Sequence, residues 1–504
     1  MARARRPQTT RTRKQTSTKR PQTRSPRPQT TSARNGSILA WEDDPGTPTT
    51  TRHPVTRPIP RLTASSLPLR IRGRQPAARE QEVGTPAFRY WANAEALARA
   101  AEFWAQTLPK GTKWFPSNGA QLTVELDEDA DLNAFYDRNG LHFFHGIVDG
   151  TTVYSAESPD VACHELGHAV LDALKPQLWD VMSAEVAAFH ESFGDMSAML
   201  SALQLRSLRE EVLAETASRL DRSSRLSRLA EQLGWAIRQA HPDATDRDCL
   251  RNASNSFFYT DPMMLPPSAP ATQLSSEPHS FSRVFTGAFL EILGGIFLTQ
   301  TKHDQAALLK TAADAGTILV NAIKSSPVVP TYYSQVAAHM LDIDLAQFRG
   351  RYRDALKSAF VRHGILSLQA ATTPPPPEDR RGARRAFATI APGAEDEPIS
   401  RIALPAAHLG LSEDLLVAAP SHPKRFAVAG AAPDLGAAES PSHDKAASSF
   451  LEDLARRGRL AFEDDAATAA AVIAPHARKT HEVVRENTQL VLLRRYFDCG
   501  LDPA

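Results

Sequence analysis

The sequence has few cysteines, no long apolar run and no acidic residue in its first 35 positions, and each shortage excludes a class of protein. Cys163, Cys249 and Cys499 are the three cysteines among 504 residues. Such a sparse, odd set gives no disulfide framework and favours a reducing compartment. The best apolar run, 287–298, is too short to cross a membrane and contains Glu291, so no transmembrane segment is predicted.

The first 35 residues carry eleven Lys and Arg, although the net charge of the whole chain is only +1. The remaining 469 residues therefore sum to −10, because +1 less +11 is −10. The start of the chain is also poor in apolar residues, so we predict a disordered basic tail over 1–60. Two interpretations of this tail stay open: a solvated extension, or salt-dependent contact with nucleic acid or an anionic surface.

The tail lacks the apolar region of a secretory signal peptide. We therefore expect a cytoplasmic protein, or one that is exported by a route without a conventional signal peptide. The sequence leaves the oligomeric state open.

Beyond the tail, the patterns predict an α+β protein. Helical periodicity at 88–108 is followed by strand-like alternation at 122–126 and 141–144. Mostly helical sequence then runs to about 368, with apolar periodicity in 184–202, 225–240, 281–299, 304–323 and 333–362. Four prolines at 374–377 cannot continue a helix and mark a linker. The predicted regions are a first lobe at 85–180, a helical lobe at 181–370, a Pro-rich linker at 371–400, and a small C-terminal region at 401–504. In the last region we expect a helix at 446–457 and a hairpin at 480–497, without evident chemistry.

The segment His164-Glu165-Leu166-Gly167-His168 is an H-E-x-x-H motif in a helical context. Residues four apart lie on one face of a helix, so both imidazoles can bind a single zinc ion. The glutamate between them can act on a water at that ion. A catalytic zinc site needs a third protein ligand as well.

Glu191 is the predicted third ligand, because it lies on a second helical segment with Asp195 four residues later. Asp195 can then accept the second ring N–H of a ligand histidine and fix its tautomer. Glu185 is a rival third ligand, but no acidic residue follows it at that spacing. His190, next to Glu191, is expected to point elsewhere.

Further blocks surround these helices in a fixed order. They are Asn133-Ala134-Phe135-Tyr136, Asp149-Gly150-Thr151-Thr152, Leu250-Arg251-Asn252-Ala253-Ser254 and His279-Ser280-Phe281-Ser282. Together with the H-E-x-x-H motif and the Glu191–Asp195 pair, they resemble the thermolysin family of zinc endopeptidases over about residues 85–368. The resemblance implies a two-lobed thermolysin-like catalytic domain, with a mixed β/α N-lobe that includes the zinc helix and a mostly helical C-lobe.

The resemblance also implies the roles of individual residues in peptide-bond hydrolysis at one catalytic Zn²⁺. The implied metal ligands are His164, His168 and Glu191, with Asp195 behind them. Glu165 is the implied general base, His279 stabilises the transition state, and Arg251 holds a substrate carbonyl. Asn133, Ala134 and Phe135 pair with an extended peptide or protein substrate.

The chain departs from the family in ways that matter. Trp179 stands where the family has an active-site tyrosine, and either a hydrogen-bonding role or core packing is open to it. Asp160 matches one calcium-binding position but Ala202 stands at another, so calcium is expected to be absent or limited to one site. The family's usual signal peptide and folded pro-segment are not seen. An alternative is therefore a thermolysin-like scaffold with weak or no proteolysis that acts as a binding module.

Overall fold

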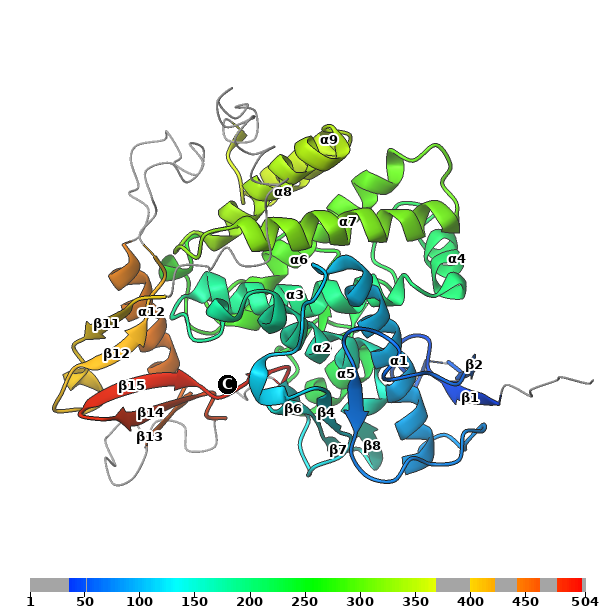
Figure 1. Ribbon diagram of the computed structural model, residues 1–504, viewed down its shortest axis with the longest axis horizontal. Helices are drawn as coiled ribbons and strands as arrows, with labels where there is room; N and C mark the ends of the chain where they lie inside the picture. The colour runs from blue at the N-terminus through cyan, green and yellow to red at the C-terminus, as the bar shows by residue number, and fades with distance from the viewer. Residues whose placement is uncertain (1–35, 51, 369–398, 422–441, 463–477, 501–504) are drawn as a thin grey trace, which may run out of the picture. The chain divides into compact units, whose positions relative to one another are not determined.

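The computed structural model describes residues 36–50, 52–368, 399–421, 442–462 and 478–500 (Figure 1). The described residues, from 36 onward, belong to one compact unit. The eleven Lys and Arg of residues 1–35 and most of the predicted linker at 371–400 lie outside the described residues. Within the described residues the protein is a mixed α+β protein, as the sequence predicts.

The prediction of a disordered tail as far as residue 60 was wrong for its last part. Strands β1 (Ser37–Ala40) and β2 (Val55–Pro58) pair in antiparallel fashion. Ile38 is fully buried, and the Trp41 ring packs edge-on against Phe88. The prediction rested on the low average apolar content of residues 1–60. The few apolar side chains near residue 40 are nevertheless enough for these strands to fold, because they pack on helix α1.

The helices agree closely with the predicted periodicity. They are α1 (Pro86–Thr107), α2 (Pro159–Leu174), α3 (Ala184–Ala202), α4 (Arg206–Glu215), α5 (Glu231–Ala240), α6 (Pro278–Leu298), α7 (Gln305–Ser325), α8 (Tyr332–Phe348), α9 (Arg353–Arg362) and α12 (His443–Arg456). The predicted helical stretch at 333–362 is divided, because Arg349 and Gly350 both take positive φ angles between α8 and α9.

The other strands are short. They are β3 (Leu69–Ile71), β4 (Leu122–Glu125), β5 (Ala134–Tyr136), β6 (Gly140–Phe143), β7 (His145–Val148), β8 (Thr151–Tyr154), β9 (Arg228–Leu229), β10 (Arg251–Asn252), β11 (Arg401–Leu404), β12 (Leu415–Ala418), β13 (Leu460–Phe462), β14 (His481–Glu486), β15 (Gln489–Arg494) and β16 (Phe497–Asp498). β14 and β15 form the predicted hairpin, and Asn487 in its turn has a φ of 56°.

One five-stranded sheet positions the site. Its strand order is β16-β5-β6-β4-β3, in which β3, β4 and β6 are parallel while β5 and β16 are antiparallel to their neighbours. Helix α2 packs beside β5. The last described residues of the chain therefore lie next to the strand against which the H-E-x-x-H helix packs.

Helices α2, α3 and α6 form the centre of the core and approach closely. At Gly194 of α3, an added Cβ would lie 2.6 Å from ring atoms of His164. At Gly167 of α2, an added Cβ would lie 2.9 Å from the Cα of Gly194. Both glycines are therefore needed for the close approach that brings the ligand residues of the two helices together.

The C-terminal region forms a second five-stranded sheet, with the order β11-β12-β15-β14-β13, packed with α12 (Figure 1). Its apolar core includes Phe450 and Leu451 from α12 and continues into Met182 and Ala187 at the start of α3. After β15 the chain returns to β5. This region is thus joined to the rest of the unit by a shared core and by a shared sheet.

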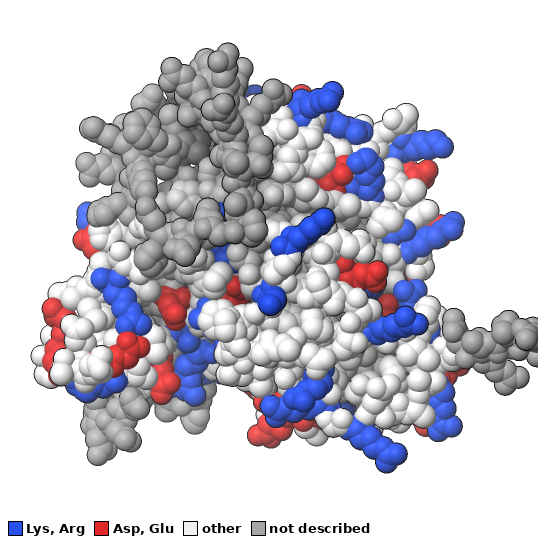
Figure 2. All heavy atoms as spheres, viewed as in Figure 1, with Lys and Arg blue, Asp and Glu red and all other residues white. Residues whose placement is uncertain are grey.

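Helices α6 and α7 are long and apolar enough to cross a membrane by length and composition alone, but 83% and 61% of their most apolar windows are buried within the protein. Buried core helices of soluble proteins pass the same test. On the face shown in Figure 2, Lys and Arg are interspersed with Asp and Glu. On that face, the described residues do not gather one sign of charge over a single element.

Candidate metal centre

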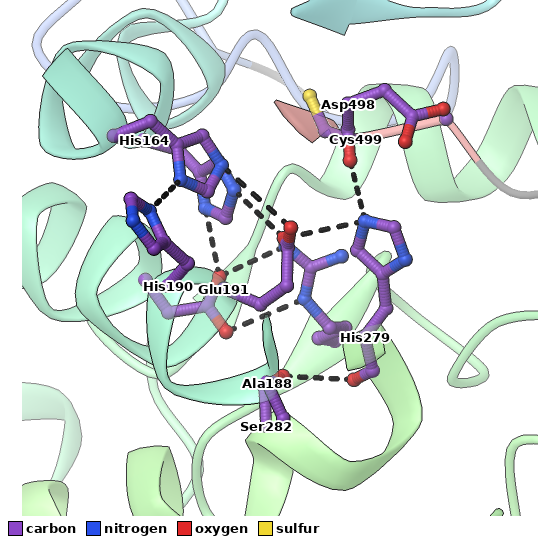
Figure 3. Close-up of polar contacts among 12 residues, drawn as sticks. His164, Ala188, His190, Glu191, His279, Ser282, Asp498 and Cys499 are labelled. Atoms are coloured by element: carbon purple, nitrogen blue, oxygen red, sulfur yellow. Dashed lines mark hydrogen bonds and ion pairs between the residues drawn. The ribbon is translucent and has the colours of Figure 1, made fainter. Parts of the chain in front are cut away.

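Helices α2 and α3 bring three predicted ligand residues together. Ser158 caps α2 by accepting a hydrogen bond from the Val161 N–H, which fixes where the helix begins. His164 and His168 then lie one turn apart and face Glu191 of α3 (Figure 3). One ligand atom from each of the three residues lies within 4.8 Å of the others, and all three side chains are buried.

We call His164, His168 and Glu191 the donor group, because each offers an atom that could bind a metal. These atoms lack hydrogen-bond partners among the described residues. Nε2 of His164 lies 3.3 Å from Oε2 of Glu191, and Nε2 of His168 lies 3.8 Å from Oε1. Neither Nε2 atom nor Oε2 of Glu191 makes a hydrogen bond. Buried polar atoms without partners are costly, and a cation bound between two imidazoles and a carboxylate would satisfy all three. The group therefore fits a metal ion, and its ligand types suit zinc among others.

Outer contacts set the tautomers of both histidines. Nδ1 of His164 lies 3.1 Å from Oδ1 of Asp195, so this nitrogen donates and Nε2 is left to bind a metal. Nδ1 of His168 lies 3.4 Å from Nδ1 of His190, which can accept in the same way. Burial lowers the pKa of His168 well below its usual value, which favours the neutral form that binds metals.

Glu165 lies beside the donor group without belonging to it. Its side chain is fully buried, and burial is the main reason that its pKa rises to about 7. A carboxylate with a pKa near neutral can both accept and release a proton during a reaction cycle. Its Oε2 atom makes no hydrogen bond, whereas Oε1 accepts one from the thiol of Cys499 at 2.8 Å.

Arg251 packs behind the donor group. Its Nη2 donates to Oδ1 of Asp195 at 2.9 Å, and its Nε donates to Oδ2 at 3.3 Å. Burial raises the pKa of Asp195, but the charges and hydrogen bonds of Arg251 and His164 together outweigh burial and hold the pKa below its usual value. The remaining nitrogen, Nη1 of Arg251, is buried and has no hydrogen-bond partner in the part of the chain that the structure describes. That nitrogen is free to hold a carbonyl of a bound molecule.

His279, at the start of α6, lies on the other side of Glu191. Its Nε2 is 3.2 Å from Oε2 of Glu191, and its Nδ1 is 2.7 Å from Oε1 of Glu277. Burial lowers the pKa of His279, but the two carboxylates outweigh burial and raise the pKa to about 10. Figure 3 shows the His279 ring facing the backbone of Asp498.

The strand edge predicted to receive an extended peptide is occupied by the chain itself. Strand β16 pairs with β5 in antiparallel fashion, with Phe497 opposite Tyr136 and Asp498 opposite Phe135. Asn133, directly before β5, is buried and accepts a hydrogen bond from the Gly500 N–H through its Oδ1. The sequence predicted the edge strand but not its partner.

Several residues at the site were missed because they lie in 401–504, where the sequence showed no chemistry. They are Arg459, Arg494, Phe497, Asp498 and Cys499. The alternation of β14 and β15 predicts strands, but such alternation does not say that the next two residues will join another sheet. The structure thus brings part of this region to the site, which the sequence did not indicate.

Trp179 belongs to the core. Its indole N–H donates to the carbonyl of Arg494 at 3.3 Å, and its ring packs edge-on against Tyr136 and Phe497. Its one polar atom is therefore engaged with backbone and does not point at the donor group.

Asp160, the residue at the family's calcium-binding position, lies in a buried cluster. It accepts a hydrogen bond from the Ala230 N–H, and burial followed by the charges of Asp43 and Asp44 raises its pKa well above its usual value. Arg52 lies in the same cluster and forms ion pairs with two of its acids. Its Nη1 is 3.3 Å from Oδ2 of Asp43, and its Nη2 is 2.7 Å from Oε2 of Glu231. A guanidinium thus supplies positive charge among these acids.

Glu185, the rival third ligand, points away from the donor group. It accepts hydrogen bonds from the Tyr259 hydroxyl at 2.5 Å and from the Tyr333 N–H at 2.8 Å. Burial is the main reason that its pKa rises from about 4.5 to about 8.

We expect Glu185→Gln to change how stability depends on pH. The folded chain keeps a proton on Glu185 that the unfolded chain loses above about pH 4.5, so this residue lowers stability as the pH rises to about 8. Glutamine removes that loss, so the difference in unfolding free energy between variant and wild type should grow by about 5 kcal/mol across the window. Denaturant unfolding at several pH values measures it, and parallel curves would contradict the assignment.

A scan of family models and a search of curated proteins each found no match to this chain.

Proposed function

We propose that this protein is a zinc-dependent endopeptidase whose catalytic domain has the two-lobed, thermolysin-like arrangement. The observation that carries the proposal is the buried group of His164, His168 and Glu191, with Glu165 and His279 on either side of it. A donor group alone suits many metalloproteins. A buried glutamate with a pKa near 7 beside that group suits hydrolysis in particular.

Zinc, when held by these three residues, would act as a Lewis acid toward a peptide carbonyl and would acidify a water. Glu165 takes a proton from that water and passes it to the amine that leaves. His279 carries a proton on Nε2, because its pKa is about 10, and donates it in a hydrogen bond to the carbonyl oxygen as negative charge develops there.

The substrate in this proposal is an extended peptide that lies along β5. The strand offers backbone groups for pairing, and Asn133 adds an amide oxygen that accepts from a peptide N–H. The unpaired Nη1 of Arg251 can donate to a further carbonyl. These contacts recognise peptide backbone, so the proposed substrate class is an unstructured protein segment.

The test is metal analysis of the full chain combined with cleavage of an unstructured protein. We expect bound zinc, cleavage that stops when a chelator removes the metal, and cleavage that returns when zinc is restored. Tight zinc binding without cleavage, in the wild type and in the Gly500→Val chain described below, would favour the binding scaffold instead.

A further inference from the structure

The last described residues, 497–500, lie where the proposed substrate would bind. Beyond the β16–β5 pairing, the Cys499 N–H donates to the Ala134 carbonyl at 3.0 Å, and the Gly500 N–H donates to Oδ1 of Asn133 at 2.8 Å. Strand addition to β5 is the binding mode expected of an extended peptide. Residues 497–500 already bind to β5 in this way.

The same segment contacts the two groups that the proposed reaction needs. The Asp498 carbonyl accepts a hydrogen bond from Nε2 of His279 at 2.5 Å, and the Cys499 thiol donates to Oε1 of Glu165 at 2.8 Å (Figure 3). A peptide carbonyl thus lies against the proposed oxyanion stabiliser. The thiol occupies a hydrogen-bonding position on Glu165 that a reacting water would need.

Side chains anchor the segment on both sides of these contacts. The Phe497 ring stacks on His190 with centroids 4.0 Å apart and on His168 at 5.0 Å. The Asp498 carboxylate lies 3.4 Å from Nη1 of Arg459, at the end of α12. Phe497 and Cys499 are 2% and 1% exposed, so the segment is buried in the site rather than laid over it.

One small cavity lies beside the segment among the described residues. This cavity, of about 30 Å³, is lined by Glu191, His279 and Asp498, among others. This volume holds a water or two, which is far less than a peptide chain needs. A substrate cannot reach Glu165, which is itself fully buried, while the segment is in place.

We infer that residues 497–500 are a built-in occupant of the peptide-binding strand and that they hold the protein latent until they withdraw. The inference rests on the proposed function, because it assigns the same strand to substrate. It implies that substrate competes with the segment, and that the rate of cleavage follows the fraction of molecules in which the segment has left.

Gly500→Val is the variant that should displace the segment. An added Cβ at this glycine would lie 2.7 Å from Oδ1 of Asn133 and 2.6 Å from Nη1 of Arg478. Both distances are too short for a real contact, and Oδ1 of Asn133 is further held by the Ala134 N–H. Gly500 lies at the end of the described chain, so the clash can be relieved by withdrawal of the segment without disturbing the core.

The experiment compares the zinc-loaded wild type with zinc-loaded Gly500→Val in two measurements. The first is the rate at which iodoacetamide alkylates Cys499, located by mass spectrometry, with Cys249→Ser as a control for the other buried thiols. The second is the rate of cleavage of an unfolded protein. We expect both rates to rise about tenfold or more in Gly500→Val, with unchanged zinc content, because both report the open fraction.

The two measurements separate the inference from the proposed function. Alkylation of Cys499 as rapid in the wild type as in Gly500→Val overturns the inference, whatever the cleavage rates. Equal cleavage by the two chains, with Cys499 protected only in the wild type, overturns latency as well. Absence of cleavage in both chains counts against the peptidase, and the alkylation rates then still decide whether the segment occupies the strand.

Discussion

The Glu165→Gln chain is expected to keep its zinc and to cleave an unstructured protein about 10²–10⁴-fold more slowly than the parent chain. Glutamine has nearly the same shape as glutamate but cannot take a proton from water. Because Glu165 does not belong to the donor group of His164, His168 and Glu191, its replacement leaves the metal ligands in place. The loss should therefore appear in kcat and not in metal content.

This measurement is best made in the Gly500→Val background, so that the terminal segment does not mask the effect. Glu157→Gln is a matched control, because Glu157 is also buried and burial raises its pKa to about 7 as well. Its nearest charged partner is Arg89, at 3.5 Å, and it takes no part in the donor group. Cleavage by Glu165→Gln at the parent rate would remove the general base from the proposal.

Glu191→Gln is expected to weaken zinc binding by more than about 100-fold, the upper end of the loss seen when only an outer-shell partner of a metal site is removed. The carboxylate of Glu191 faces both ligand histidines, at 3.3 and 3.8 Å, and supplies the negative charge of the group. A neutral amide is a much poorer ligand for a divalent cation. Competition with a chelating dye gives the dissociation constants directly.

Glu185→Gln is the control for this experiment, since Glu185 lies buried on the same helix one and a half turns earlier and hydrogen-bonds to Tyr259 and Tyr333. It should bind zinc as tightly as the wild type. Zinc lost from Glu185→Gln and kept by Glu191→Gln would reverse the assignment of the third ligand. Circular dichroism on both chains separates loss of metal from loss of fold.

The resting structure has consequences for any assay of this protein. The donor group, Glu165 and His279 are all buried, and Cys499 contributes to closing the site. A preparation with intact C-terminal residues is therefore expected to show low activity even when it is fully loaded with zinc. Proteolytic loss of residues 497–500 during purification would raise the activity of the sample.

Local patterns were sufficient where the deciding contacts lie within one helix. The i, i+4 spacing of His164 and His168 places both rings on one face of α2, and the same spacing places Glu191 and Asp195 on one face of α3. The periodicity of apolar residues also predicted α3 with its observed bounds. None of these features depends on residues distant in the sequence.

Patterns failed where a contact joins distant residues. Nothing near Ile38 indicates that α1 will bury it, and the prediction of disorder at 36–60 failed for that reason. The thiol of Cys499 and the carboxylate of Glu165 are 334 residues apart, and no local pattern links them. The two-residue strand β16 can pair with β5 only because β15, in the other sheet, ends close to β5 in the folded protein.

The sequence by itself placed His164 and His168 on one face of α2, because helix geometry converts their spacing directly into a shared face. The close approach of α2 and α3 was decided by tertiary packing at Gly167 and Gly194, where Cβ atoms would collide. The folded chain alone decided that β5 would be covered by 497–500. A strand edge accepts any suitable backbone, so only the full path of the chain selects which segment reaches it.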